Sequence, residues 1–203
     1  MNEPAVVLTD WLLTLECGLF AALTRGRFAG FFAALALASL LGGAVHGFFH
    51  GALWWHVAIW RGALLATGAA ALFAAEEALL LLGARRFRGL VRAVFAAYAA
   101  ALAIGLDRFG LVVAVYLPAA ALLLAGFART ARLRGEPRVA LGAWGLGATL
   151  VAAPVQQLRL GVHPAYFDHN AVYHVIQAAA LLLVFAGARA LRATDPAARE
   201  VRC

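Results

Sequence analysis

The sequence of 203 residues has no lysine, only two cysteines and only 13% charged residues. The cysteines are Cys17, inside an apolar run, and Cys203 at the end, so no structural disulfide is expected. Hydrophobic residues make up 65% of the chain, and the mean hydropathy is +0.86. This composition excludes intrinsic disorder and an ordinary soluble domain. We therefore expect an integral membrane protein.

Seven apolar stretches are predicted to cross a bilayer as helices, because a hydrocarbon core of about 30 Å requires roughly 20 residues per helix. The stretches are apolar on all sides, which excludes transmembrane strands. The opening residues MNEP lack a basic region, so the first stretch is interpreted as a retained helix and not a signal peptide. Short connections leave room for one domain over residues 1–203. The predicted spans are residues 5–24, 28–50, 57–83, 90–106, 111–128, 139–155 and 171–191.

The basic residues predict the orientation of these helices. All 17 are arginines, and 14 of them follow the first, third, fifth or seventh span, whereas Arg61, Arg108 and Arg159 lie elsewhere. The positive-inside rule places the N-terminus outside and the C-terminus in the cytoplasm. The formal charge of +7 is thus explained by membrane topology and not by nucleic-acid binding. We expect an all-α seven-helix bundle in the inner membrane of a bacterium.

Histidines and other polar residues gather at the predicted outer level of the membrane. Such groups cost several kcal/mol inside a bilayer unless they are paired or hydrated, so their positions are informative. His46 and His50 lie four residues apart and share one helical face, while Asn170 and His174 share a face of the seventh span. Asp10 lies at a similar depth on the first span. The pattern predicts that these side chains face one another or water.

Small residues alternate with the histidines of the second span. Gly43, Gly47 and Gly51 form a GxxxGxxxG pattern. The pattern predicts that another helix approaches the second span closely along this face.

Several neutral imidazoles together with a carboxylate favour a divalent metal, most plausibly zinc. A bound zinc lowers the pKa of water to about 7 and polarises a carbonyl, which would permit hydrolysis at a membrane surface. The candidate ligands are His46, His50, His169 and His174. Asp10 and Asp168 are candidates for the group that handles the proton.

Two segments resemble signature helices of a known superfamily. LLGGAVHGFF, residues 40–49, and HNAVYHVIQ, residues 169–177, resemble the second and seventh helices of the seven-transmembrane hydrolases that include alkaline ceramidases and adiponectin and progestin receptors. The resemblance implies a zinc-dependent hydrolase that cleaves an amide or ester of a membrane lipid. It also implies that His46 and His174 are zinc ligands.

The chain departs from the pattern of this superfamily at two positions. Gly42 stands at the position of a serine, and Asn170 stands at the position of the first histidine of the seventh-helix pair. His50 and His169 are therefore candidates for the remaining ligands, and Asn170 is a candidate catalytic group. His169 precedes His174 by five residues, so it reaches the same metal only if the helix begins after it. The two motifs also resemble a bacterial branch of the superfamily.

Two other functions remain open at the level of sequence. In the first, histidines of the second and seventh helices bind haem in a redox protein. In the second, the chain is a non-catalytic assembly or binding subunit with an interfacial polar belt. Membrane lipid is an expected partner in each case.

Simpler interpretations also exist for single residues. Histidines at the end of a span can contact lipid headgroups, and Asp168 can cap a helix. Asp10 can pair with Arg61. Glu76 and its neighbour Glu77 are expected to pair with Arg85 or Arg86.

Overall fold

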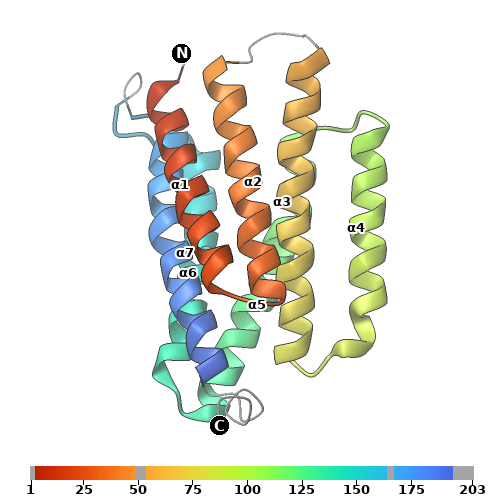
Figure 1. Ribbon diagram of the computed structural model, residues 1–203, viewed down its shortest axis with the longest axis vertical. Coiled ribbons are helices and arrows are strands. Elements are labelled where there is room, and N and C mark those ends of the chain that lie inside the picture. The colour runs from red at the N-terminus through yellow and green to blue at the C-terminus, as the bar shows by residue number, and fades with distance from the viewer. Residues whose placement is uncertain (1–2, 49–53, 164–166, 194–203) are drawn as a thin grey trace.

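The computed structural model describes residues 3–48, 54–163 and 167–193, and within them the chain is all-α (Figure 1). A short 3₁₀ turn at Arg85–Phe87 precedes the fourth helix, and an isolated bridge joins His163 to Phe167. The expected all-α bundle is thus confirmed for the described residues. The helices are α1 (Pro4–Leu23), α2 (Arg27–Phe48), α3 (Trp54–Leu81), α4 (Arg88–Ala103), α5 (Phe109–Arg134), α6 (Pro137–Gln157) and α7 (His169–Ala193).

Consecutive helices run in opposite directions, and six of them form a ring. Around this ring the contacts follow the order α1, α2, α3, α5, α6, α7 and back to α1 (Figure 1). Helix α4 stands outside the ring and packs mainly on α3. Helix α1 begins at the end of the bundle where the α2–α3 and α6–α7 connections lie, and α7 ends at the opposite end.

Six of the seven helices are long and apolar enough to cross a membrane, so the fold is that of a multi-pass membrane protein. Helix α4 does not reach that length. Its 16 residues extend over about 24 Å, less than the hydrocarbon core of about 30 Å. The prediction of seven complete spans is confirmed for six, and α4 is shorter than a complete span.

Helix α5 is longer than the stretch predicted from hydropathy, residues 111–128. It continues to Arg134. Its last two turns carry arginines, and such turns can lie beyond the apolar layer of the membrane. Gly135 ends the helix in a left-handed conformation, φ 61°, which glycine adopts without strain. Pro137 then occupies the first turn of α6, where its missing N–H costs no hydrogen bond.

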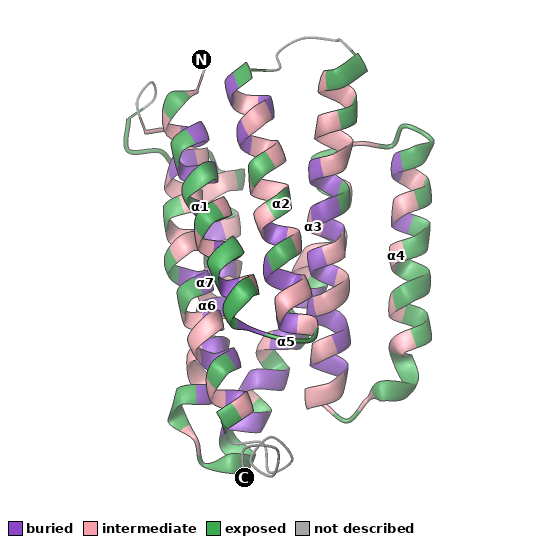
Figure 2. Ribbon diagram, in the orientation of Figure 1, coloured by how far each residue is buried: buried purple, intermediate pink, exposed green. Residues whose placement is uncertain are grey.

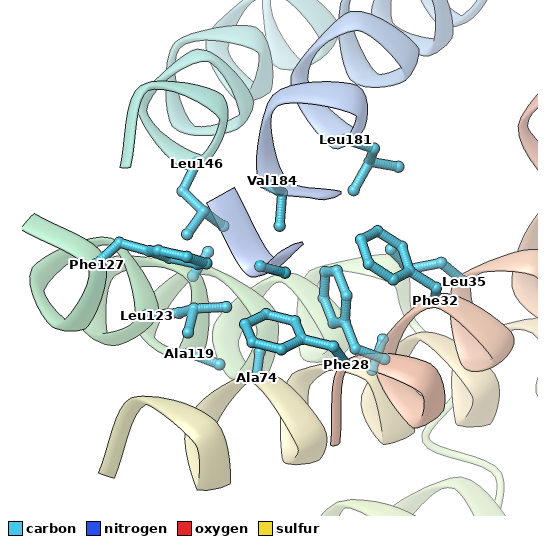
Figure 3. Packing of buried hydrophobic residues seen from close by; sticks show 14 of the residues in the cluster. Phe28, Phe32, Leu35, Ala74, Ala119, Leu123, Phe127, Leu146, Leu181 and Val184 are labelled. Atoms are coloured by element: carbon cyan, nitrogen blue, oxygen red, sulfur yellow. The ribbon is translucent and has the colours of Figure 1, made fainter. Parts of the chain in front are cut away.

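Aromatic packing fills the half of the ring away from the start of α1. Phe28 and Phe32 of α2 meet Leu123 and Phe127 of α5 and Val184 of α7 (Figure 3). Phe32 and Phe127 are 0% exposed. Dispersion contacts between such close-packed side chains stabilise this half of the ring.

Helix α4 is attached at one aromatic anchor. Most of its surface is exposed (Figure 2), but Tyr98 is 3% exposed and its hydroxyl donates a hydrogen bond of 2.6 Å to the Leu64 carbonyl of α3. A Cβ at Gly68 would overlap Cε1 of Tyr98, so only glycine leaves room for this ring. The anchor fixes α4 beside the ring without making it part of the wall.

Candidate functional site

The half of the ring that the phenylalanines do not fill encloses a cavity of about 710 Å³. Each of the six ring helices contributes to its wall, and α4 does not. Much of the wall is apolar. Its polar members are Asp10, Ser39, His46, Thr67, Tyr116, Thr149, Gln156, Gln157, Asn170, Tyr173, His174 and Gln177. The structure therefore brings Asp10, His46, Asn170 and His174, four of the residues selected from the sequence, to the wall of one cavity.

Asp10 and His174 face each other across the boundary between α1 and α7. Oδ1 of Asp10 lies 3.5 Å from Nε2 of His174, and the two side chains are 6% and 14% exposed. The second carboxyl oxygen, Oδ2, is buried and has no hydrogen-bond partner among the described residues. A buried carboxyl oxygen without a hydrogen-bond partner is costly, so its presence in the cavity wall calls for an explanation.

The Thr9 hydroxyl contacts the second ring nitrogen of His174. The Thr9 hydroxyl lies 2.9 Å from the Ala5 carbonyl and 3.0 Å from the Val6 carbonyl, and it lies 3.1 Å from Nδ1 of His174. Carbonyl oxygens only accept, so when the single hydroxyl proton is directed toward one of them, the hydroxyl oxygen is left as an acceptor for His174. The hydroxyl oxygen then accepts from Nδ1–H of His174.

In this tautomer, with the proton on Nδ1, the neutral His174 ring presents the lone pair of Nε2 to Asp10. An ionised carboxylate also offers only lone pairs. Two such acceptors 3.5 Å apart repel each other unless a cation, either a proton or a metal ion, lies between them. The Asp10–His174 contact is therefore a site for a cation.

His46 is oriented by a different acid. Its Nδ1 lies 2.5 Å from Oε2 of Glu3, the residue that precedes α1. An ionised carboxylate can only accept, so Nδ1 is the donor and the lone pair of a neutral His46 ring lies on Nε2. A carboxylate bonded to the second nitrogen is the usual arrangement around a histidine that ligates a metal.

Glycines on α2 allow α1 to approach the cavity. A Cβ at Gly43 would lie 2.9 Å from Cδ1 of Trp11, and one at Gly47 would lie 3.0 Å from Cγ2 of Val7. The predicted close approach is confirmed at these two glycines, and Gly51 lies outside the described residues. Gly42 differs, because its Cβ would meet Oδ2 of Asp10 at an ordinary 3.5 Å.

Amide side chains complete the polar part of the wall. Nε2 of Gln156 donates to Oδ1 of Asn170 at 3.4 Å, which leaves the amide hydrogens of Asn170 as the donors it can offer to a ligand. Gln177 is 6% exposed, and its Oε1 is buried without a hydrogen-bond partner in the described part of the chain. The wall thus presents both donors and acceptors to the cavity.

Two further candidates from the sequence, His169 and Asp168, are not part of this wall. His169 is the first residue of α7, and five residues along a helix correspond to a rotation of about 140°, so it points away from the side of His174. Oδ1 of Asp168 accepts a hydrogen bond of 3.0 Å from the backbone N–H of Ala171, which is the role of a helix cap. His50 lies outside the described residues.

Across residues 3–48, 54–163 and 167–193, no three histidine, cysteine, aspartate or glutamate side chains lie close enough together to hold a metal ion. Asp10 and His174 form one pair of such side chains, and His46 lines the same cavity. Sequence reasoning missed Glu3 and Thr9. Thr9 adjoins Asp10, but its partner is 165 residues away and depends on the order of helices around the ring.

The proposed pairing of Asp10 with Arg61 is wrong. Nε of Arg61 lies 2.9 Å from Oδ2 of Asp107, in the connection between α4 and α5. The indole N–H of Trp60 donates to the Asp107 carbonyl at 3.0 Å and holds the same connection. Asp10 therefore does not pair with Arg61, and its carboxyl group lines the cavity.

The expected partners of Glu76 are also wrong. Its carboxylate contacts Nε of Arg27 at 3.1 Å and Nε of Arg92 at 2.6 Å, not the guanidinium groups of residues 85 and 86. Its neighbour Glu77 lies 3.9 Å from Nη1 of Arg27. These pairs lie at the end of the bundle away from the cavity, because Glu76 is near the end of α3.

Comparison with known proteins places the chain in a family. No curated protein matches the sequence, and no solved structure matches it. Residues 5–193 match a family of unknown function, and this segment contains Asp10, His46 and His174. The chain therefore belongs to the family of unknown function DUF6962.

Proposed function

We propose that this protein is a zinc-dependent hydrolase of the membrane, which cleaves an amide or ester of a lipid-like molecule bound in the cavity. The observation that carries the proposal is the contact of 3.5 Å between Oδ1 of Asp10 and Nε2 of His174. With the His174 proton on Nδ1, bonded to Thr9, both atoms offer lone pairs and a cation between them would remove their repulsion.

The donor atoms fit zinc. Two imidazoles and one carboxylate are the ligands of one class of catalytic zinc site, and donors about 2.1 Å from a tetrahedral zinc lie about 3.4 Å from each other. The Asp10–His174 distance of 3.5 Å is close to that spacing. His46, from the same wall, would supply the third ligand. Bound zinc would polarise a carbonyl and activate a water molecule.

Two residues would keep the imidazoles in the orientation that ligation requires. Glu3 accepts from Nδ1 of His46, and the Thr9 hydroxyl accepts from Nδ1 of His174. Each contact directs the Nε2 lone pair away from the orienting group. Because Glu3 and Thr9 orient the two rings, the arrangement favours zinc ligation over contact of the two histidines with lipid headgroups.

The cavity suits an amphipathic substrate. Its volume of about 710 Å³ lies within the range of 300–1,000 Å³ that is usual for ligand pockets. The apolar wall would contact a hydrocarbon chain, while Asn170 and Gln177 would bond the polar part. Oδ2 of Asp10, buried beside Gly42, would accept the proton of the attacking water.

We further propose that the protein lies in the inner membrane of a bacterium with its N-terminus outside. Arginines concentrate at the ends of α3, α5 and α7, where α2, α4 and α6 begin. The positive-inside rule places that end in the cytoplasm. The cavity would then open toward the periplasmic leaflet.

A non-catalytic lipid-binding protein is the second candidate. It is favoured by the lack, among the residues that the structure describes, of three side chains already grouped around a metal position. In that case a proton would occupy the contact between Asp10 and His174, and the cavity would bind a lipid without cleaving it.

An activity screen tests the proposal. The full chain, purified in detergent, is incubated with fluorogenic long-chain amides and esters, with and without a chelator. We expect zinc-restorable hydrolysis that His174→Ala reduces by at least about a hundredfold. His169→Ala is the matched control, because this histidine begins the same helix outside the cavity. Binding of the substrates without turnover by both forms would favour the lipid-binding alternative, and a Soret band would indicate haem.

A further inference from the structure

A second polar cluster lies at the end of the bundle opposite the cavity. We call it the arginine cluster. It joins the α1–α2 connection, the start of α2, the last turns of α3, the first turns of α4 and the last turn of α7. Its members are Arg25, Arg27, Arg88, Arg92 and Arg192, which surround the carboxylates of Glu76 and Glu77.

Glu76 is fully occupied by two of these arginines. One carboxyl oxygen lies 3.1 Å from Nε of Arg27 and the other lies 2.6 Å from Nε of Arg92, while the Glu76 side chain is 9% exposed. Charge-assisted hydrogen bonds of this kind link α2, α3 and α4. These hydrogen bonds explain the position of Glu76, but they do not involve Arg25, Arg88 or Arg192.

Glu77 is the second carboxylate of the arginine cluster. Arg27, Arg88 and Arg192 all act on its carboxylate, and the closest contact is 3.9 Å, from Nη1 of Arg27. A Cβ at Gly26 would lie 3.7 Å from Nη2 of Arg192, so the glycine turn places this guanidinium against the α1–α2 connection. Arg192 and Arg25 repel each other there.

The cluster therefore has an excess of positive charge. Five guanidinium groups surround two carboxylates, which leaves three positive charges unbalanced within the cluster. Nε of Arg88 is buried and has no hydrogen-bond partner among the described residues. A buried, unbonded guanidinium N–H is costly, and an anion that accepts from it would remove that cost.

We propose that the arginine cluster binds the phosphate group of an anionic membrane lipid. Arg88 and Arg192 would donate to the phosphate oxygens, because Arg27 and Arg92 are engaged by Glu76. The first turn of α4 adds the backbone N–H groups that follow Arg88, since Phe87 at its N-cap makes no side-chain capping bond and the N–H of Arg88 itself donates to the Arg85 carbonyl. The cluster lies at the ends of membrane-spanning helices, the depth at which lipid phosphates lie.

Lipid binding by the full chain tests this proposal. Native mass spectrometry in detergent compares phosphatidylglycerol with phosphatidylcholine of the same acyl chains. We expect a preference for phosphatidylglycerol of at least about tenfold. The double variant Arg88→Gln, Arg192→Gln should lower binding of phosphatidylglycerol at least about fivefold. Equal binding of the two lipids by the unmodified protein would overturn the proposal.

A matched control separates this site from a diffuse positive surface. Arg132→Gln with Arg138→Gln removes two charges from the same end of the bundle, in α5 and α6, away from the cluster. We expect this variant to change binding of phosphatidylglycerol less than about twofold. An equal loss in both double variants would contradict a specific site.

Two further experiments address a variant that does not fold and the source of the bound phosphate group. If the glutamine variant does not fold, Arg88→Lys with Arg192→Lys keeps the charge but removes the guanidinium donors, and it should still weaken binding. Glycerol 1-phosphate and inorganic phosphate are added as soluble competitors. Displacement of the lipid by either at equal concentration would show a free phosphate site and overturn the lipid assignment.

Discussion

Nε2 of His174 and Oδ1 of Asp10 lie 3.5 Å apart inside the helix ring. When the hydroxyl of Thr9 accepts the proton of the neutral imidazole at Nδ1, both atoms present lone pairs to each other. Without a proton or a metal ion between them, these two atoms repel each other. The proposed zinc chemistry therefore depends on this contact in the cavity wall.

Asp10→Asn should stabilise the metal-free protein. An amide nitrogen at this position can donate to Nε2 of His174, so a hydrogen bond of about 1 kcal/mol forms without the proton or metal ion that the Asp10 carboxylate needs. The same change removes an anionic ligand and should reduce zinc binding. Thermal unfolding with chelator and with zinc measures both effects. A variant whose Tm with chelator is lower than that of the unmodified protein would contradict the lone-pair assignment.

Glu3→Ala should weaken metal binding without unfolding the protein. Glu3 holds His46 through Nδ1, and loss of such an orienting group lowers metal affinity by about 10–100-fold. Zinc titration with a competing chelator measures the change. Glu136→Ala is the control, because Glu136 caps α6 at the other end of the bundle and should leave the zinc affinity unchanged. Equal zinc affinity of Glu3→Ala and the unmodified protein would show that Glu3 has no such role.

Adjacent glycines of α2 should respond differently to serine. Gly43→Ser places a Cβ 2.9 Å from Cδ1 of Trp11, so α1 must move and we expect a loss of about 1–3 kcal/mol. Gly42→Ser meets the Asp10 carboxylate at 3.5 Å and can donate a hydrogen bond to it. Its stability should equal or exceed that of the unmodified protein. Comparison of the two unfolding midpoints tests the predicted contact between α1 and α2, and the reverse order would contradict it.

Glu76→Gln should destabilise the bundle more than Glu77→Gln. The Glu76 side chain is 9% exposed and accepts from two arginines, whereas Glu77 is 17% exposed and has one contact, at 3.9 Å. We expect a loss of about 1–3 kcal/mol for the first variant, because two guanidinium groups lose their buried acceptor. Denaturation in mixed detergent provides the measurement. Equal stability of both variants would show that the α2–α3–α4 link contributes little.

The positions of the helices could be predicted from apolar runs, because the bilayer requires a fixed length of apolar chain per helix. Helix α7 was expected over residues 171–191 and spans His169–Ala193. The ends were less predictable: hydropathy detects only the apolar part of α5, whose arginine-bearing turns continue to Arg134.

The partners of buried polar groups could not be predicted in the same way. Arg27 and Glu76 are 49 residues apart, and Thr9 and His174 are 165 apart. Such pairs depend on which helices are neighbours in the ring, and hydropathy carries no information about that order. Helical periodicity placed Asp10, His46 and His174 at one level, while Glu3 gave no signal because it precedes the first apolar run.

Zinc content, measured by mass spectrometry on detergent-purified protein after dialysis against a weak chelator, tests the central claim most directly. We expect about one zinc per chain in the unmodified protein and in His169→Ala. We expect almost none in His46→Ala, His174→Ala or Asp10→Ala. An unmodified protein without zinc, or the same zinc content in His174→Ala as in His169→Ala, would contradict a metal centre at the Asp10–His174 contact.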